Sequence, residues 1–240
     1  MKEICSISSG TTGFDYQKYG SLITDEPKKT NKHTRKFIIT RNVEPFLAIW
    51  GERINYLKKA FHHPYFIYDK QKVTDGKWLL FNSKKIVIRG MAKSLTAGLD
   101  EEGFALGVGV YALTSIKINP KYLLAILNSR LMDFYYKGKF ASKHLAGGYL
   151  GFNVGQLELI PVRMINKNNE AIHQKLIKLS DEIIKAQKKL QKETKLSDRY
   201  TRLKEEVKDL NKQIDQQVYK LYGLTEKEIK IVEKNENECI

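Results

Sequence analysis

The sequence has very few cysteines and no long apolar run. Cys5 and Cys239 are its two cysteines, and they lie at opposite ends of the 240 residues without CxxC or Cys/His spacing. This excludes a disulfide framework and a cysteine-ligated zinc site. No apolar run approaches the length of a membrane-spanning helix. The start, MKEICSISSG, also lacks the basic and apolar regions of a signal peptide, so we expect a cytoplasmic protein.

Signatures of catalysis are also missing. The chain contains no GxxxxGK(S/T), HExxH or GxSxG motif, and no NPPY-like tetrad of the type that adenine methyltransferases use against a flipped base. Asp15, Glu26 and Lys28 match the D…ExK spacing of metal-dependent nucleases, but Pro27 interrupts the strand that this motif needs. We therefore expect no catalysis from this chain alone.

Two clusters of metal-ligand residue types have a structural interpretation. His62 and His63 are adjacent, so in a strand they face opposite sides and are poorly placed to share one ion. The acidic residues 100–102 lie between Gly98 and Gly103, which is typical of a solvated turn. Neither cluster predicts a metal site.

Acidic residues are scarce in the first two thirds of the chain. Of a formal net charge of +15, residues 1–165 carry 25 Lys and Arg against 13 Asp and Glu, whereas residues 166–240 carry 17 against 14. A positive field of this kind concentrates polyanions, which favours DNA, RNA or an anionic membrane as a partner. The absence of an RNP-type aromatic motif disfavours RNA. A generally lysine-rich proteome is the alternative explanation of the charge.

Basic clusters are the candidates for nucleic-acid contact. Residues 27–41 contain no acid, basic residues surround the segment KIVIR (85–89), and residues 137–153, KGKFASKHLAGGYLGFN, carry three lysines and four glycines without a carboxylate. Lysines and arginines neutralise phosphates, and glycine-rich backbone can approach a groove closely. A solvated loop is the alternative for residues 27–41, and a tight turn is the alternative for the Gly-Gly pair. The DNA-binding candidates are Lys28, Lys29, Lys32, Arg35, Lys36, Arg41, Lys84, Arg89, Lys93, Lys139, Lys143, His144, Gly147 and Gly148.

Two of these candidates are predicted to read bases. Arg41 and Arg89 are chosen because a guanidinium can pair bidentately with guanine. A buried or a phosphate-bound arginine is the alternative for each. Strand alternation would place Lys85 and Arg89 on one face with Val87.

The first part of the chain predicts short strands and one core helix. Residues 79–81, 85–89 and 105–113 are rich in branched or aromatic residues and bounded by turn residues. Residues 46–50 and 53–57 flank Gly51-Glu52 and predict a hairpin, with one helix over residues 45–61 as the alternative. Asn119-Pro120 then starts a largely apolar helix that is expected to end at Gly138.

The last part of the chain predicts two facing helices. From residue 172, apolar residues follow a 4-3 spacing that loses register near residues 193–198. We place a reversal there, so that two helices of about 30 Å each face one another. A single continuous helix is the alternative. Thr225 and Glu228 predict a capping box at the start of a short final helix.

Several segments resemble, in the same order, the TaqI-like C-terminal specificity domain of type II restriction-modification enzymes and adenine-N6 DNA methyltransferases. They are SISSGTTGFDY, KFIITRNVEPFLAIWG, KKIVIRGMAKSL, YLLAILNSRLMDFYY, KHLAGGYLGFN with the following LIPV, and VYKLYGLTEKEIKIVE. The resemblance covers nearly the whole chain. It implies an α/β (α+β) fold, with a twisted, mainly antiparallel sheet domain and a core helix in residues 1–165. A helical hairpin and a short C-terminal helix in residues 166–240 would pack against the recognition or catalytic part.

The resemblance also implies what the chain binds. The expected partners are double-stranded DNA and a methyltransferase or nuclease domain, and no membrane. S-adenosylmethionine, and magnesium for a nuclease, would belong to those other domains, so no cofactor is expected in this chain. The chain would be the C-terminal part of a longer polypeptide or a separate specificity subunit. Base-contacting residues vary with the target in this family, so none is carried over. A coiled-coil scaffold with incidental charge and a DNA-modifying enzyme are the alternatives.

Overall fold

The computed structural model describes residues 1–25, 30–140 and 146–234. The chain divides into two compact units. We call Met1–Lys117 with Gly151–Leu159 the sheet unit, and Ile118–Leu150 with Ile160–Ile240 the helical unit. The helical unit thus includes the core helix that the sequence analysis assigned to residues 1–165, and the functional division at residue 165 stays a prediction. In the described residues no helix is long and apolar enough to span a bilayer.

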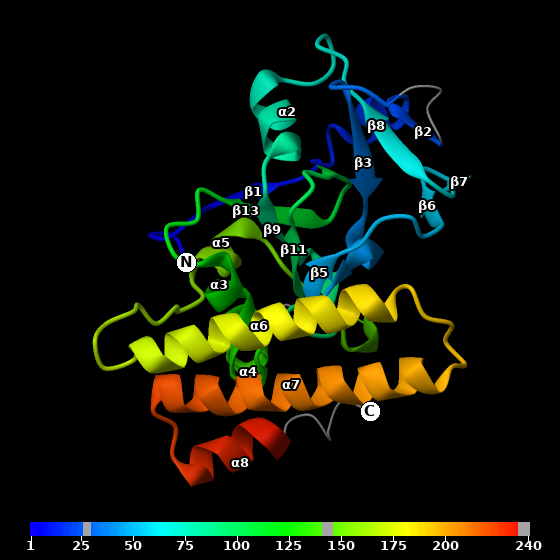
Figure 1. Ribbon diagram of the computed structural model, residues 1–240. Coiled ribbons are helices and arrows are strands. Elements are labelled where there is room, and N and C mark those ends of the chain that lie inside the picture. Colours follow the sequence, from blue (N-terminus) through cyan, green and yellow to red (C-terminus); the bar gives the residue numbers. More distant parts are fainter. Residues whose placement is uncertain (26–29, 141–145, 235–240) are drawn as a thin grey trace. The chain divides into compact units, whose positions relative to one another are not determined.

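In the described part of the chain, two larger, mainly antiparallel sheets form most of the sheet unit (Figure 1). Their strands are β1 (Ser6–Ser9), β2 (Ile23–Asp25), β3 (Thr34–Ile38), β4 (Val43–Glu44), β5 (Phe46–Ala48), β8 (Pro64–Ile67), β9 (Lys85–Arg89), β11 (Ala97–Asp100), β12 (Ala105–Leu106) and β13 (Val110–Thr114). Among the described residues, one sheet has the order β1-β13-β9-β11-β5-β4 and the other the order β12-β3-β8-β2. The pairs β11–β5 and β12–β3 are parallel. The predicted mixed α/β fold with a mainly antiparallel sheet is confirmed.

Shorter elements complete the sheet unit. They are α1 (Tyr16–Gly20), the 3-10 turn η1 (Thr40–Asn42), β6 (Ile54–Tyr56), β7 (Lys59–Phe61), α2 (Asp75–Asn82), β10 (Met91–Ala92) and α5 (Val154–Glu158), with β14 (Leu150–Gly151) where the chain returns to this unit. The start of α2 is capped by Thr74, whose hydroxyl accepts a hydrogen bond from the Lys77 amide at 3.2 Å.

An aromatic core joins α2 to the four-stranded sheet. The ring of Phe81 on α2 lies 5.3 Å edge-on from Phe66 on β8, and Phe66 lies 6.4 Å from Phe37 on β3. All three side chains are buried, and burying each contributes about 2 kcal/mol to folding. Since Phe37 and Phe66 face α2, Lys36 and Tyr65, which alternate with them, point to the opposite, outer face of this sheet.

Two sequence predictions in this unit are wrong. Residues 79–81 belong to α2 rather than to a strand, and their burial follows a helix: Phe81 is buried whereas Leu79 is exposed. The predicted hairpin around Gly51 does not form either. β5 pairs with β4 and β11, and β6 pairs with β7 through a two-residue turn. That turn is Leu57-Lys58, and both residues have positive φ, which the handedness of a tight hairpin requires.

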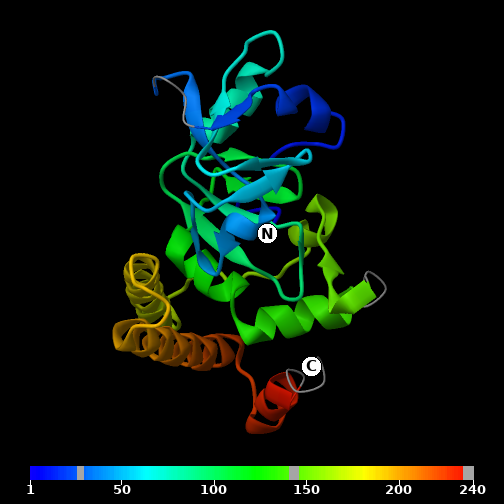
Figure 2. The same cartoon turned by 90° about the vertical axis from the view of Figure 1, so that its right-hand side faces the viewer.

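The core helix of the helical unit is two helices, α3 (Pro120–Leu127) and α4 (Arg130–Lys139). They meet at an angle, as Figure 2 shows in green. Ser129 begins α4 by accepting a hydrogen bond from the Met132 amide, so the chain changes direction there. Every α3 residue from Tyr122 to Leu127 is buried, so this part of the helix is covered on all sides. α4 continues beyond Gly138, so the predicted end at this glycine is wrong.

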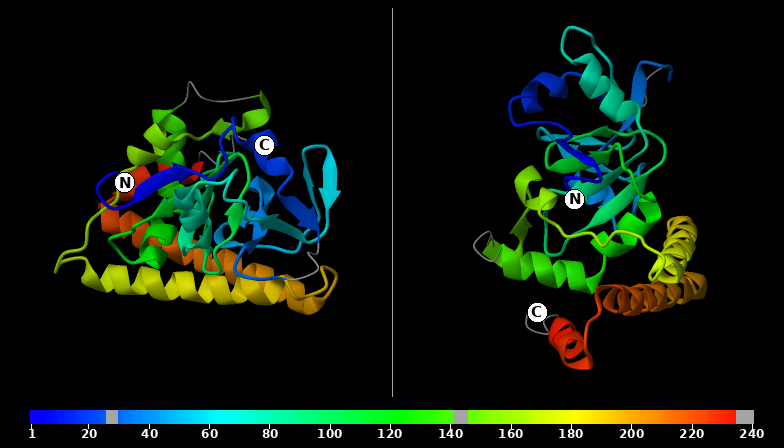
Figure 3. Two further views of the ribbon diagram at one scale, coloured as in Figure 1. Left: turned by 90° about the horizontal axis from the view of Figure 1, so that it is seen from above. Right: turned by 90° about the vertical axis from the view of Figure 1, so that its left-hand side faces the viewer.

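The predicted helical hairpin is present. α6 (Glu170–Leu190) and α7 (Asp198–Tyr222) lie side by side, as Figures 1 and 3 show from different directions, and the reversal falls at residues 191–197 as expected. Gly223 has a φ of 74° and ends α7. α8 (Glu226–Lys234) starts with the predicted capping box, in which Thr225 donates its amide to the Glu228 carboxylate at 2.8 Å.

A histidine is buried between α3 and α6. His173 is 8% exposed, its ring lies 4.6 Å edge-on from Tyr122, and neither ring nitrogen has a hydrogen-bond partner among the described residues. Burial lowers the pKa of His173, and the nearby Glu170 carboxylate only partly opposes this. The folded state therefore holds a neutral imidazole, whereas the unfolded chain exposes it to water.

We predict that the helical unit loses stability as the pH falls through the ordinary pKa of histidine. Below about pH 6.5 the unfolded chain binds a proton that folded His173 resists, so the free energy of unfolding decreases. The variant His173→Phe removes this contribution. Urea unfolding followed by far-UV circular dichroism should show a shallower pH dependence for the variant than for the wild type between about pH 7 and pH 5. Equal slopes would show that His173 is protonated as easily in the folded as in the unfolded chain.

Candidate nucleic-acid interface

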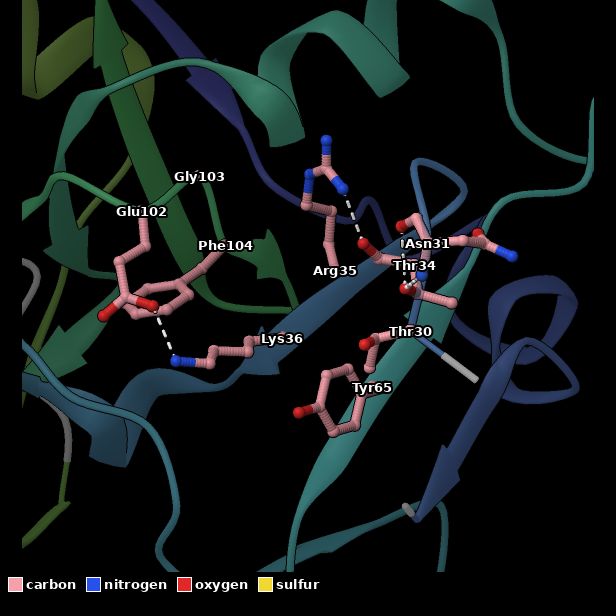
Figure 4. A pocket seen from close by; sticks show the side chains of 9 residues that line it. All are labelled: Thr30, Asn31, Thr34, Arg35, Lys36, Tyr65, Glu102, Gly103 and Phe104. Carbon is pink, nitrogen blue, oxygen red and sulfur yellow. Dashed lines mark hydrogen bonds and ion pairs between the residues drawn. The ribbon is translucent and has the colours of Figure 1, made fainter. Parts of the chain in front are cut away.

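A cavity of about 370 Å³ opens on the four-stranded sheet (Figure 4). It lies between the segment before β3, the strands β3 and β8, and the loop that follows β11. Two cations, a carboxylate, hydroxyls, an amide and two aromatic rings thus line one small volume. The residues that line it are Thr30, Asn31, Thr34, Arg35, Lys36, Tyr65, Glu102, Gly103 and Phe104.

Lys36 is the best-placed cation of this cavity. On β3 it stands opposite Tyr65 of β8, so both side chains share the outer face of the sheet. Its ammonium nitrogen lies 2.6 Å from a carboxylate oxygen of Glu102 and 4.8 Å from the ring centre of Trp50. The indole of Trp50 is itself fixed, because it donates a hydrogen bond to the Pro64 carbonyl at 2.8 Å.

The loop that carries Glu102 is held from below by a buried carboxylate. Asp100 is fully buried and accepts hydrogen bonds of 2.8–3.0 Å from the amides of residues 102, 103 and 104. It also pairs with the ammonium of Lys85 at 2.6 Å, and both side chains are wholly inaccessible to water. Gly103 has a φ of 80°, and a Cβ there would lie 2.8 Å from the Asn82 carbonyl oxygen. Glu102 therefore sits on a loop with little freedom to move.

These contacts correct two sequence interpretations. Asp100 is part of a buried ion pair rather than of a solvated turn. Lys85 shares a face with Val87 as expected, but this face points into the core, so Lys85 is unavailable to DNA. Burial lowers the pKa of Lys85, and the charge of Asp100 acts in the opposite direction. His62 and His63 donate their backbone amides to the carboxylate of Asp25.

Arg35 points away from Lys36 and Tyr65 (Figure 4). Its guanidinium lies 5.3 Å from the ring centre of Trp78 on α2 and donates a hydrogen bond to the Thr34 carbonyl at 2.6 Å. The Trp78 ring also stacks on Tyr68 at 4.7 Å. Arg35 thus stabilises the packing of α2 on the sheet.

A second group of candidates lies where β9 ends. Arg89 donates from Nε to the Val43 carbonyl at 2.5 Å and from Nη2 to Glu44 at 2.9 Å. Burial raises the pKa of Glu44, and the charge of Arg89 counteracts this. Arg41 belongs to η1, directly before Val43, and is exposed. Lys93 is exposed in the loop between β10 and β11. The two arginines predicted to read bases therefore come from neighbouring segments.

The remaining DNA-binding candidates fall into three groups: exposed residues of the sheet unit, residues outside the described ranges, and residues of the helical unit. Lys32 and Lys84 are exposed, and neither they nor Arg41 and Lys93 form an ion pair with any described residue. Lys28, Lys29, Lys143 and His144 lie outside the described residues. Lys139, Gly147 and Gly148 belong to the helical unit. Lys139 is exposed at the end of α4, and both glycines have positive φ, near 75°, in the turn η3 (Ala146–Gly148).

Among the residues that line the cavity, sequence reasoning named only Arg35 and Lys36 as DNA-binding candidates, and it missed the three residues next to the Lys36 side chain. Glu102 was interpreted as part of a turn, whereas Trp50 and Tyr65 were assigned no role. The usable signal was local composition: Trp50, His63 and Tyr65 are aromatic or heteroaromatic residues within 16 positions, and the ring of Tyr65 lies 5.1 Å edge-on from Trp50.

Comparisons with known proteins agree with this architecture. Residues 44–162 match the TaqI-like C-terminal specificity domain. Among curated proteins, none matches the chain. Among solved structures, the chain is similar to the type IIL restriction-modification enzyme MmeI in complex with DNA, with a TM-score of 0.55 and 10% sequence identity. The similarity covers 92% of this chain and 33% of that one. It shows a shared fold, and the chain spans about one third of that enzyme's length.

We predict that the buried ion pair is essential for the sheet unit. Lys85→Met leaves the Asp100 carboxylate buried without its cation and should lower the free energy of unfolding by about 3–5 kcal/mol. Asp100→Leu should cost more, because it leaves the Lys85 ammonium and three backbone amides without their acceptor. Urea denaturation measures both. As a control, Lys36→Met breaks a partly exposed pair and should cost at most about 1 kcal/mol. Equal losses for Lys85→Met and Lys36→Met would contradict this.

Proposed function

Because the chain contains a TaqI-like C-terminal specificity domain over residues 44–162, we propose that it recognises a short sequence in double-stranded DNA. The exposed cations of the sheet unit carry this proposal. Lys32, Arg41, Lys84 and Lys93 have no carboxylate partner among the described residues, so their charges are available to phosphates. Phosphate contacts supply most of the affinity and fix the position of a protein on the duplex.

Bases are read by side chains that can form hydrogen bonds in more than one direction, such as the guanidinium of arginine. Arg41 is exposed next to the segment that holds Arg89, and a guanidinium matches the two acceptors of guanine in the major groove. The contacts of Arg89 use Nε and Nη2, which fixes its guanidinium at the end of β9. We assign Lys139, Gly147 and Gly148 to backbone contact. Lys28, Lys29, Lys143 and His144 are assigned the same role from the sequence alone.

The chemistry belongs to another domain or subunit. In this proposal the chain positions DNA for an S-adenosylmethionine-dependent adenine-N6 methyltransferase of a type II restriction-modification enzyme in the cytoplasm. The cofactor, and magnesium for any nuclease, bind that other part. The hairpin α6–α7 serves protein contact, because residues 166–240 are almost neutral. The chain by itself neither methylates nor cuts DNA.

The proposal predicts strongly salt-dependent binding. If Lys32, Arg41, Lys84 and Lys93 each neutralise one phosphate, the logarithm of the association constant should fall with the logarithm of salt concentration with a slope of about −3.6. Fluorescence anisotropy with a mixed pool of labelled duplexes measures this slope. Replacing Lys32, Arg41, Lys84 or Lys93 by Ala should each reduce its magnitude by about 1.

The helical hairpin α6–α7 provides the control. Arg202→Ala and Lys204→Ala remove exposed cations from α7 and should leave the slope unchanged. A slope near zero for the wild type, or a loss of affinity with these two variants alone, would contradict DNA binding by the sheet unit. Either result would favour a scaffold built on the helical hairpin.

A further inference from the structure

We propose that Lys36 and Glu102 together read one base pair of the DNA target, by sensing which strand carries the keto base. This inference rests on the proposed function, since it requires that the chain binds duplex DNA through its sheet unit. The pair lies in the cavity on the four-stranded sheet. DNA can reach both side chains without a large movement, because they are 35% and 59% exposed.

The charges in the cavity favour a base edge over a phosphate. A phosphate next to Lys36 would also lie close to the Glu102 carboxylate, 2.6 Å from the ammonium nitrogen, and two anions so near one another repel. A neutral group that offers both an acceptor and a donor satisfies both side chains. The hydroxyls and the amide that line the cavity fit such a ligand as well.

The spacing of the ion pair matches the spacing of a base pair. In the major groove, the guanine O6 acceptor and the cytosine N4 donor are hydrogen-bonded to one another, so they lie about 2.9 Å apart. The Lys36 nitrogen and the Glu102 oxygen lie 2.6 Å apart. An ammonium placed over O6 therefore brings the carboxylate over N4, and each protein group meets its complement at the same time.

This arrangement senses which strand carries the keto base, whether that base is guanine or thymine. Thymine O4 is a keto acceptor like guanine O6, and adenine N6 is an amino donor like cytosine N4. In one orientation on the duplex, the pair accepts G·C and T·A and rejects C·G and A·T, where a donor would face Lys36 and an acceptor would face Glu102. Guanine is preferred over thymine because its N7 offers the ammonium a second acceptor.

The Lys36 side chain and the backbone of Glu102 are held in place before DNA arrives. Lys36 lies over the Trp50 ring, and the amide of Glu102 is bound by the buried Asp100 carboxylate. A pre-positioned donor and acceptor lose little conformational freedom on binding. The free energy of the new hydrogen bonds therefore contributes to the discrimination between base pairs.

The test is a charge swap. The full chain selects duplexes from a random pool, and the bound fraction is sequenced for the wild type and for the double variant Lys36→Glu/Glu102→Lys. The wild type should prefer keto bases, G above T, by roughly tenfold at one position of the recovered sequence. The swapped variant keeps an ion pair but reverses donor and acceptor, so the same position should change to C or A.

A matched control is available in the helical unit. Lys121 and Asp181 also form an ion pair of 2.6 Å, with side chains 31% and 36% exposed. The swap Lys121→Asp/Asp181→Lys should leave the recovered sequence unchanged. Because Lys36→Glu also loses the Trp50 contact, Glu102→Gln is measured as a second variant. Its carboxamide donates as well as accepts, so the keto preference at that position should fall several-fold while overall affinity does not decrease.

The possible results separate this inference from the proposed function. If the wild type recovers no sequence from the pool, DNA target recognition by this chain is wrong, and base readout by Lys36 and Glu102 is wrong with it. If the wild type recovers a sequence that neither the swap nor Glu102→Gln alters, DNA recognition stands and this inference is overturned. A change at one position, with the Lys121–Asp181 control unaltered, supports it.

Discussion

The buried ion pair between Lys85 and Asp100 is the constraint on which the sheet unit depends. Two charges without access to water are costly unless each is fully bonded. Asp100 meets this requirement with the ammonium of Lys85 and the amides of residues 102–104, and Lys85 also donates to the carbonyls of Phe81 and Ser83. One set of bonds thus ties the end of α2, the start of β9 and the loop after β11 together. The position of Glu102 follows from this network.

This fixed loop places the Glu102 carboxylate next to Lys36 on the outer face of the four-stranded sheet. The ion pair of Lys36 and Glu102 lies over Trp50 and beside Tyr65, so charge, hydrogen bonding and an aromatic surface occur together. Some other cations of the unit are engaged internally, as for Arg35 on Trp78. A DNA-reading surface needs both kinds of group: free cations hold phosphates, while oriented donors and acceptors distinguish bases.

Most features that depend on residues close together in the sequence could be predicted, whereas features that depend on distant residues could not. The α6–α7 hairpin and the capping box of Thr225 depend on spacings within a few residues, and both were predicted. The strand at residues 85–89 is equally local. The Leu57-Lys58 turn was missed because neither residue signals a positive φ. The burial of Asp100 was missed because its partner Lys85 is 15 positions away, and the cavity because its lining comes from separate segments. Which candidate residues contact DNA stays a prediction.

The central claim is that the sheet unit, and not the helical hairpin, meets DNA. Hydrogen–deuterium exchange of the full chain with and without a duplex pool tests it most directly, because it reports each segment separately. The account predicts slower exchange on DNA addition in peptides that cover residues 30–41, 84–93 and 100–104, and unchanged exchange in α6 and α7. Protection confined to α6 and α7, with no change in the three segments of the sheet unit, would contradict it.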